Sequence, residues 1–373
     1  MKLTVKTQAL IKALNEAIDA IPSASTEPSF KNFLLSVTDD ALEVVASDGS
    51  VTLKTVLPAK EGEKENIISC EPGKVQAPAH FLLDIVKSLD GDTVTLEAVD
   101  TSLMTVSDQR TYYKVNTISA DEYPDVYMDF DDSRAVRITS EDFKKLYEAT
   151  SFAVAAKSSK LCFTGINIRT NEDRLYFLAT DACRLAQMSV PLPSAPQIKI
   201  TVPVKVLNMI SKKDGLKEVE LEVSESKALF RAGDTIFQSR IIPGEFPNLE
   251  RIRPASTPYK LTVNSSEFLK ALDRVTIVAS VSPAPVARLT CSQDGSELVA
   301  SSTNGDVKEP LKSCTFEGDL FQIAFNTRFV SEAVKALNAP KVTLSFAGEG
   351  KIFVVQSDDV DNDQIITPVR IGY

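Results

Sequence analysis

The chain has 373 residues, of which 43% are hydrophobic and 25% are charged, a balance typical of a folded globular protein. No apolar run approaches the ~20 residues that cross a bilayer, so we expect no membrane segment. The formal net charge of −10 argues against a nonspecific affinity of the whole surface for nucleic acid, but it does not exclude a local basic lining inside an acidic shell.

The N-terminus and the cysteines indicate where the protein works. The opening run 1–5 begins as a strand and lacks the apolar core of a signal peptide. The five cysteines form no CxxC pair, and their odd number and scattered positions fit a reducing compartment. Both features predict a cytoplasmic protein.

The first predicted elements are a short strand and a helix, and both recur. A β-prone run is followed by apolar residues at helical spacing, with Leu10, Phe143 and Phe268 in matching places. This pattern covers residues 3–14, 136–147 and 260–272. A motif that recurs about every 125 to 130 residues is too long for a solenoid repeat and indicates three copies of one domain.

Each copy continues with the same order of predicted elements. The hairpins are predicted at 32–37 with 42–46, at 165–169 with 175–179, and at 286–290 with 298–301. A second helix follows Pro78, Pro203 and Asn326, because proline suits the first helical turn and asparagine the N-cap. Alternating strands come next, at 94–98, 219–223 and 342–346, and closing strands end at 115–118, 239–242 and 365–371.

This order of elements predicts the fold class. Each copy is expected to be an α+β domain in which two helices pack on antiparallel sheet. The three domains are expected at residues 1–130, 131–256 and 257–373. We expect linkers at 129–134, which is acidic, and at 253–258, which is rich in proline and serine.

Several short motifs resemble those of one known family. Thr180-Asp181-Ala182-Cys183-Arg184-Leu185-Ala186 looks like its Thr-Asp-Gly-His-Arg-Leu-Ala segment, and Phe246-Pro247-Asn248 resembles its Phe-Pro-Asp/Asn corner. Thr367-Pro368-Val369-Arg370-Ile371 resembles its Met-Pro-(Met/Val)-Arg-Leu terminus, and Pro28 with 32–35 is similar to its Leu-Pro-Ile-Leu-Gly-Asn-Leu-Leu stretch. Because these motifs occur in this order within a threefold repeat, the chain resembles the bacterial DNA polymerase III β subunits, the β sliding clamps.

The resemblance has departures that bear on the site. Ala182 and Cys183 replace Gly-His, Thr367 replaces a methionine, and Gly372-Tyr373 extends beyond the usual end. Ala24 stands where some members carry an arginine that touches DNA, so that contact is not expected here. The first three departures bear on the peptide preference more than on the fold.

The sequence contains little that suggests an enzyme. The single histidine, His80, cannot form a His-rich metal site, and no nucleotide-binding or hydrolase motif occurs. Acidic clusters lie at 129–132 and 358–363, where solvated loops are the ordinary interpretation and a cation site is an alternative at the second. We expect no catalytic residues, no metal and no cofactor.

Basic residues interrupt the apolar pattern of all six predicted helices. Point-like ammonium groups attract phosphates in any register and read no bases, which suits a protein that slides on DNA. The alternative is ordinary amphipathic helices with solvated basic faces. The candidate DNA-facing residues are Lys12, Lys87, Lys145, Lys205, Lys212, Arg274 and Lys335.

The resemblance also implies a peptide pocket between the second and third domains. Its residues match positions far apart in sequence, which can meet only at a domain junction, a common place for a cleft. Ordinary sheet and core positions are the alternative. The matching residues are Phe163, Thr180, Arg184, Leu185, Pro247, Arg251, Ile252, Ile365 and Thr367.

A subunit interface is the third site that the resemblance implies. Family members meet head to tail through a late strand of the first domain and the first helix of the third. The corresponding residues are Tyr113, Val115, Val275 and Ile277. For Tyr113 and Val115, an internal strand pair is the alternative.

The leading hypothesis is a homodimeric ring that serves as a polymerase processivity factor in bacterial or phage DNA replication. It encircles duplex DNA without sequence preference and tethers its partners through the pocket. The expected partners are the DNA polymerase III alpha subunit, the clamp loader and other proteins with a clamp-binding motif. The alternative is a nonenzymatic scaffold that keeps the clamp fold but binds only protein; a metal-dependent hydrolase ranks third.

Overall fold

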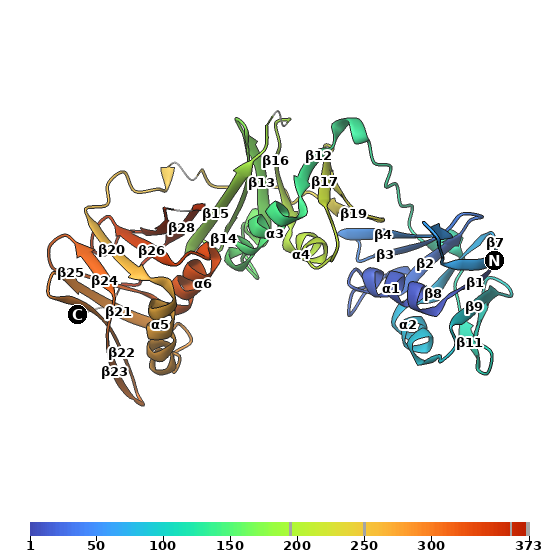
Figure 1. Cartoon of the computed structure of the whole chain (residues 1–373), viewed down its shortest axis with the longest axis horizontal. Coiled ribbons are helices and arrows are strands. Elements are labelled where there is room, and N and C mark those ends of the chain that lie inside the picture. Colours follow the sequence, from blue (N-terminus) through green and yellow to red (C-terminus); the bar gives the residue numbers. More distant parts are fainter. Residues whose placement is uncertain (194–195, 249–250, 359, 371–373) are drawn as a thin grey trace. The chain divides into compact units, whose positions relative to one another are not determined.

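The computed structural model describes residues 1–193, 196–248, 251–358 and 360–370, and most of its helices and strands are labelled in Figure 1. The chain forms two compact units. One combines Met1–Ser140 with Lys205–Ile241, and the other combines Glu141–Val204 with Ile242–Tyr373. The central repeat contributes strands to both units.

The first unit contains two large antiparallel sheets and the helices α1, α2 and α4. A five-stranded sheet has the order β11-β10-β9-β1-β7, and an eight-stranded sheet has the order β12-β17-β18-β19-β4-β3-β2-β8. The first repeat supplies β1 (Lys2–Lys6), α1 (Thr7–Ile18), β2 (Asn32–Val37), β3 (Ala41–Ser47), β4 (Val51–Pro58), β5 (Lys60–Glu61), β6 (Lys64–Glu65), β7 (Ile67–Glu71), β8 (Gly73–Pro78), α2 (Ala79–Ser88), β9 (Thr93–Ala98), β10 (Leu103–Ser107) and β11 (Tyr112–Asn116). The central repeat adds β12 (Val136–Thr139), α4 (Val204–Ser211), β17 (Glu218–Val223), β18 (Lys227–Ala232) and β19 (Thr235–Arg240).

The second unit has a nine-stranded sheet in the order β16-β13-β14-β15-β28-β27-β26-β20-β24 and a four-stranded sheet in the order β23-β22-β21-β25. The central repeat supplies α3 (Ser140–Glu148), β13 (Gly165–Asn171), β14 (Arg174–Thr180), β15 (Arg184–Pro191) and β16 (Lys199–Pro203). The third repeat supplies β20 (Tyr259–Asn264), α5 (Ser265–Ala279), β21 (Val286–Ser292), β22 (Gly295–Ser302), β23 (Gly305–Pro310), β24 (Cys314–Glu317), β25 (Phe321–Asn326), α6 (Thr327–Leu337), β26 (Lys341–Phe346), β27 (Phe353–Ser357) and β28 (Val360–Ile366).

The two helices of the third repeat each begin at an asparagine whose side chain caps them. Asn264 caps α5 by accepting a hydrogen bond from the backbone N–H of Glu267 at 3.1 Å, and Asn326 caps α6 in the same way. Helix α6 ends at Asn338, whose φ of 46° is left-handed, a conformation that asparagine tolerates well. Within the units α1 packs against α2, and α5 against α6.

Consecutive repeats are joined by strand pairing. In the first unit β19 of the central repeat pairs with β4 of the first, and in the second unit β15 of the central repeat pairs with β28 of the third. Both pairs are antiparallel. Each junction therefore covers two sheet edges and satisfies their backbone N–H and C=O groups.

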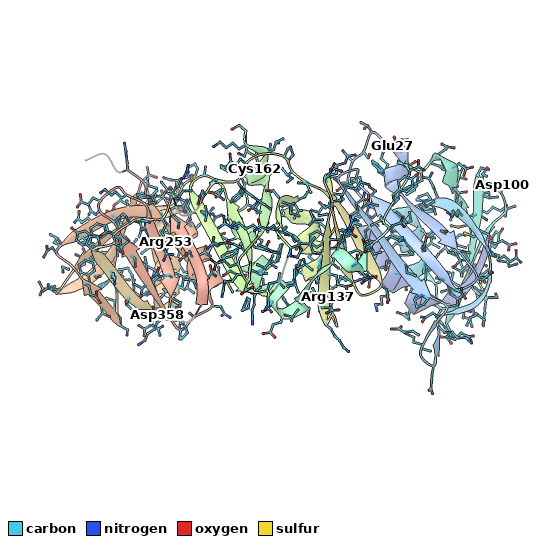
Figure 2. All side chains as sticks on the ribbon, turned by 90° about the horizontal axis from the view of Figure 1, so that it is seen from above. Glu27, Asp100, Arg137, Cys162, Arg253 and Asp358 are labelled. Carbon is cyan, nitrogen blue, oxygen red and sulfur yellow. The ribbon has the colours of Figure 1, made fainter. Side chains whose placement is uncertain are left out.

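The segment 129–134, expected as a linker, is bonded to the central repeat. The Asp131 N–H donates to Glu222 at 2.7 Å, and Asp132 forms an ion pair with Arg231. Arg231 also lies 4.5 Å from the ring centre of Phe130 and pairs with Glu220. The 3.0 Å pair between Glu220 and Arg137, labelled in Figure 2, extends this cluster across β12 and β17.

Candidate functional site

The junction between the second and third repeats has a small apolar floor. Leu185 on β15 and Ile365 on β28 are opposite each other in register and only 4% and 3% exposed. Val354 lies opposite Ile365 in the neighbouring β27–β28 pair, and the half-buried Ile252 and Ile352 complete the cluster. Opposed side chains on one sheet face pack closely, which explains why these distant segments meet.

An aromatic cluster lies in the same unit. The rings of Phe163 and Phe246 are 6.2 Å apart in an edge-to-face arrangement, and Cys162 packs with them. The Lys160 ammonium lies 5.3 Å from the Phe163 ring centre. Pro247 directly follows Phe246 and is half-buried. Phe163 thus belongs to a cluster separate from the aliphatic floor.

The turn between β14 and β15 is held by its own side chains. The Thr180 hydroxyl donates to the Arg184 carbonyl at 2.6 Å and accepts from the Ala182 N–H at 3.1 Å. Asp181 accepts from the N–H groups of Cys183 and Arg184. Ala182 has a φ of 75°, where a glycine would be unstrained.

The turn also holds the segment that follows β28. The Thr367 N–H donates to the Cys183 carbonyl at 2.8 Å, and both residues have exposed side chains. Arg251 is exposed as well, and Arg253 pairs with Asp363 at 3.1 Å (Figure 2 labels Arg253). Of the expected pocket residues, the structure brings Leu185, Ile252 and Ile365 into one cluster.

Arg184, expected as a polar residue at the edge of the pocket, bonds to other residues of its own chain. Its side chain is only 11% exposed and bonds to Asp181 and to Glu332 of α6. Glu332 was not predicted at this site, because it lies 148 residues from Arg184 in the sequence. Ile352 and Val354 were not predicted either, although the continuous apolar run 352–355 could have indicated a buried strand.

The first junction has the same backbone arrangement but polar chemistry. Thr52 is the second residue of β4, as Leu185 is of β15, and it lies opposite Gln238. The Thr52 hydroxyl is 2.8 Å from that of Ser47. The apolar floor is therefore a property of the second junction and not of the shared fold.

Most of the candidate DNA-facing residues have acidic partners within the chain. Lys145 lies 2.7 Å from Glu141, and Arg274 lies 2.5 Å from Glu309. These carboxylates raise the pKa of Lys145 and of Arg274. A further candidate, Lys212, is 4.0 Å from Asp19.

Lys205 is the most strongly engaged candidate. Its ammonium is 2.5 Å from Asp48 and 3.4 Å from the Ala20 carbonyl. Burial tends to raise the pKa of Asp48, but hydrogen bonds from Lys205 and from the turn that follows outweigh it and lower that pKa. Of all the candidates, Lys12, Lys87 and Lys335 form no ion pair with any residue that the structure describes.

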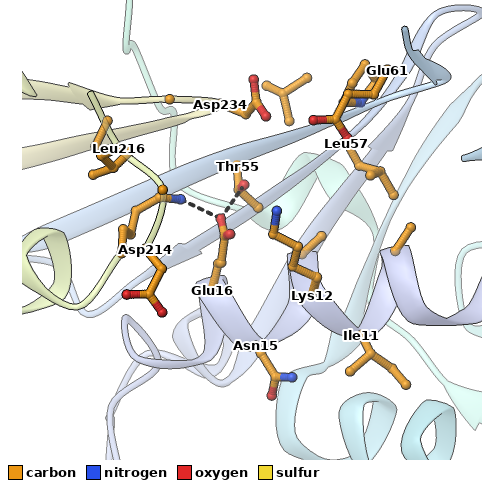
Figure 3. Close-up of a pocket in the computed structure, with 18 of the residues that line it drawn as sticks. Ile11, Lys12, Asn15, Glu16, Thr55, Leu57, Glu61, Asp214, Leu216 and Asp234 are labelled. Atoms are coloured by element: carbon orange, nitrogen blue, oxygen red, sulfur yellow. Dashed lines mark hydrogen bonds and ion pairs between the residues drawn. The ribbon is translucent and has the colours of Figure 1, made fainter. Parts of the chain in front are cut away.

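Lys12 points into a groove of about 860 Å³ in the first unit, drawn in Figure 3. At its base the Lys213 ammonium donates to Glu16 at 2.6 Å and to Thr235 at 2.7 Å. Thr55 also donates to Glu16, at 3.1 Å. This network ties α1 to the end of α4 and to the β4–β19 pair.

The expected interface residues divide into buried and exposed ones. Val115 and Val275 are fully buried in the chain's own core, so their side chains are not free to meet a partner. Val115 lies opposite Met104 in the β10–β11 pair, which agrees with the alternative of an internal strand pair. Tyr113 is half-buried, whereas Ile277 is 75% exposed.

The remaining expectations concern metals, membranes and the C-terminus. Across the described ranges, no group of three or more His, Cys, Asp or Glu side chains is placed to hold a metal ion. In that same part of the chain, no helix is long and apolar enough to cross a membrane. The candidate cation site at 358–363 lies partly outside the described residues, and the Gly372-Tyr373 extension lies outside them entirely.

Three α+β repeats joined through shared antiparallel sheets, with an apolar cluster at one junction, define a protein of the three-domain DNA clamp class. The comparisons agree over nearly the whole length. Models of the DNA polymerase III beta subunit match residues 1–128 for the N-terminal domain, 137–248 for the central domain and 250–370 for the C-terminal domain. The chain belongs to the DNA polymerase III beta subunit family, the beta sliding clamps.

Individual relatives show how far the similarity extends. The beta sliding clamp of Bacillus subtilis is 28% identical over 377 residues, which cover 99% of this chain and 100% of the relative. That of Staphylococcus aureus is 27% identical over 376 residues, 99% of each chain. The crystal structure of the B. subtilis DNA polymerase sliding clamp matches with a TM-score of 0.95, 27% identity and full coverage of both chains. The beta chain from Streptococcus pneumoniae matches in fold with a TM-score of 0.94 at 22% identity, covering 99% of this chain and 100% of that one.

Proposed function

We propose that two copies of this chain close into a ring that encircles duplex DNA and tethers the replicative polymerase. The three domains, which we delimit at 1–130, 131–256 and 257–373, form half of the ring. The observation that carries the proposal is the threefold repeat whose first and last domains each keep an uncovered sheet edge. Family membership supports the same assembly.

Two of the sheet edges, those at β11 and β23, are suited to each other. Among the strands that the structure describes, β11 pairs only with β10 and β23 pairs only with β22, so each has one row of free backbone N–H and C=O groups. The exposed Tyr112 belongs to β11, and the exposed Ile277 lies on α5, which contacts β23. A twofold axis pairs β11 of one copy with β23 of the other at two identical interfaces and so closes the ring. Val115 and Val275 support these elements from within.

Contact with DNA is proposed to be weak and sequence-independent. Because Lys145, Lys205 and Arg274 already have carboxylate partners, few ammonium groups remain to release counterions from phosphates. Lys87 and Lys335 are the strongest candidates for direct phosphate contact. The net charge of −10 also opposes tight binding. Retention on DNA therefore depends on encirclement.

The junction of the second and third domains is proposed to bind partner peptides. An apolar floor of Leu185 and Ile365 with the half-buried Ile252 beside it suits the leucine and phenylalanine anchors of a short extended peptide. Exposed Arg251 supplies a charged edge. The proposed partners are the DNA polymerase III alpha subunit, the clamp loader and other proteins that carry a clamp-binding motif.

In this proposal the protein is an accessory subunit without catalysis of its own, and it works in the cytoplasm. Nothing in the proposed function requires a bond to be made or broken. Encirclement and tethering need only a closed ring and a peptide pocket. No metal or cofactor has a part in either step.

The test compares retention on DNA of two shapes. Purified protein is loaded by a clamp loader onto nicked circular DNA, and half of the sample is then linearised with a restriction enzyme. We expect retention on circles and loss from linear DNA within minutes, because a ring slides off a free end. Equal retention on both forms would falsify encirclement. No loading on either form, together with intact peptide binding, would favour the protein-only scaffold.

A further inference from the structure

The Arg184 guanidinium has three hydrogen-bond partners within the chain. Its Nε lies 3.0 Å from Asp181 Oδ2, and its Nη2 donates to the Phe152 carbonyl at 2.5 Å. Its Nη1 bonds to Glu332 on α6. Charge-assisted contacts of this kind are the stronger hydrogen bonds of proteins, and a planar guanidinium suits several acceptors at once.

Two aromatic rings enclose the same group. The guanidinium carbon lies 4.4 Å from the ring centre of Phe329 and 5.1 Å from that of Phe152. Cation–π contact adds to the hydrogen bonds, especially where water is excluded, and this side chain is only 11% exposed. The group is thus already satisfied by its own chain and poorly placed to contact a peptide.

The same residue is continuous with the peptide pocket. Its backbone N–H is held by Asp181 and its carbonyl by Thr180, and Leu185 of the pocket floor is the next residue. The neighbouring Cys183 carbonyl accepts the Thr367 N–H. A contact that fixes Arg184 therefore fixes the turn, the floor and the strand end opposite.

The first junction contains a comparable contact, in which the helix supplies the cation and the turn supplies the acid. There Lys205, from the second helix of the next repeat, reaches Asp48 of the turn and the Ala20 carbonyl. In the second junction the turn supplies the cation and α6 supplies the acid. Both turns are tied to an element of the following repeat, which indicates that this contact positions the junction.

We propose that Arg184 is a positioning residue that clasps the pocket turn to α6 through Glu332 and Phe329, and that it sets peptide affinity without touching the peptide. This rests on the proposed peptide-binding function. Glu332 itself lines a separate groove of about 820 Å³ with Met188, Pro191 and Lys335, which none of the expected pocket residues lines. If Arg184 contacts the peptide directly, loss of the Glu332 carboxylate should leave peptide affinity unchanged. If Arg184 acts by holding the turn to α6, the same loss should weaken binding.

The experiment measures the affinity of the full-length protein for a fluorescein-labelled Gln-Leu-Ala-Leu-Phe peptide by fluorescence anisotropy. The variants are Arg184→Ala, Arg184→Lys, Glu332→Gln and the double Arg184→Ala/Glu332→Gln. Glu148→Gln is the matched control, because Glu148 lines the same groove as Glu332 but forms no hydrogen bond or ion pair with Arg184. Thermal unfolding confirms that each variant is folded.

We expect Arg184→Ala to weaken binding about tenfold, from loss of charged hydrogen bonds. Glu332→Gln should weaken it several-fold, the double variant should be no weaker than Arg184→Ala, and Glu148→Gln should match the wild type. Arg184→Lys should restore part of the affinity, since lysine keeps the charge but not the planar fork.

Two results would overturn the clasp while leaving the peptide pocket standing. One is a loss for Arg184→Ala with none for Glu332→Gln, which means direct contact. The other is unchanged affinity in both. If the wild type fails to bind the peptide saturably, both the clasp and the proposed pocket are wrong.

Discussion

Leu185 and Ile365 lie opposite each other across β15 and β28, whereas Thr52 and Gln238 hold the same register positions across β4 and β19. The two junctions share strand order and direction, so the difference comes from side chains alone. An apolar pair at the junction can bind leucine and phenylalanine anchors, whereas a threonine and a glutamine cannot supply that floor. The first junction therefore serves as an internal control for the second.

That control allows a clean test of the pocket. Pro247→Ala combined with Ile365→Ala is expected to weaken binding of a Gln-Leu-x-Leu-Phe peptide by ~2–3 kcal/mol in total, because both remove apolar contact from a hot spot. Isothermal titration calorimetry measures the affinity for the peptide. Gln238→Ala, at the matching position of the first junction, should leave the affinity unchanged. Unchanged affinity in the double variant would mean that the pocket lies elsewhere.

The first junction is expected to respond to acid. Burial tends to raise the pKa of Glu16, but bonds from Lys213, Thr235 and Thr55 outweigh it, and the pKa lies below its ordinary value of 4.5. A lowered folded-state pKa adds stability that is present above the unfolded value and lost as pH falls through the folded one.

Glu16→Gln should therefore cost about 1–2 kcal/mol of unfolding free energy at pH 7, from loss of a charged hydrogen bond. Urea titrations between pH 7 and pH 3 should show this difference shrinking below about pH 4.5. Glu97→Gln, which removes an exposed pair with Lys2, is the control and should change little. A difference that stays constant with pH would contradict the assignment.

Backbone strain at the pocket turn predicts a stabilising substitution. Ala182 has a φ of 75°, a left-handed conformation that costs an L-residue with a Cβ roughly 1 kcal/mol. Ala182→Gly is expected to raise the unfolding free energy by about 0.5–1 kcal/mol, as measured by chemical denaturation. Ala186→Gly, in regular strand β15, should lower it instead. A loss of stability in both would show that the turn is not strained.

Ring closure predicts a surface substitution that separates subunits without unfolding them. Ile277→Asp places a charge on a side chain that is 75% exposed in the single chain, so the monomer should keep its melting temperature. Sedimentation at micromolar concentration should then show a monomer where the wild type is a dimer. Leu320→Asp, at a residue that is 69% exposed between β24 and β25, is the control. An intact Ile277→Asp dimer would exclude this part of α5 from the interface.

Repeats, helix positions and caps could be predicted because they depend on neighbouring residues. The apolar spacing around Leu10, Phe143 and Phe268 and the start signal at Asn326 are local patterns. In the structure all three of these apolar residues are buried, and Asn326 caps α6. Family motifs added the pocket positions but not the orientation of each side chain.

The contacts of the charged residues were harder to predict, because their partners lie far away in the sequence and come close only in the folded chain. Lys205 reaches Asp48 over 157 positions and Arg184 reaches Glu332 over 148, and no periodicity encodes such distances. For the same reason Val115 and Val275, expected at a subunit interface, turned out to face the chain's own core.

The sequence by itself thus determined three copies of one α+β domain and the apolar identity of residues such as Leu185 and Ile365, since hydrophobic periodicity is carried by the order of residues alone. Only the tertiary structure decided which lysines remain free for DNA and that Arg184 turns toward α6. Pairing of charges and burial depend on which distant strands and helices pack together.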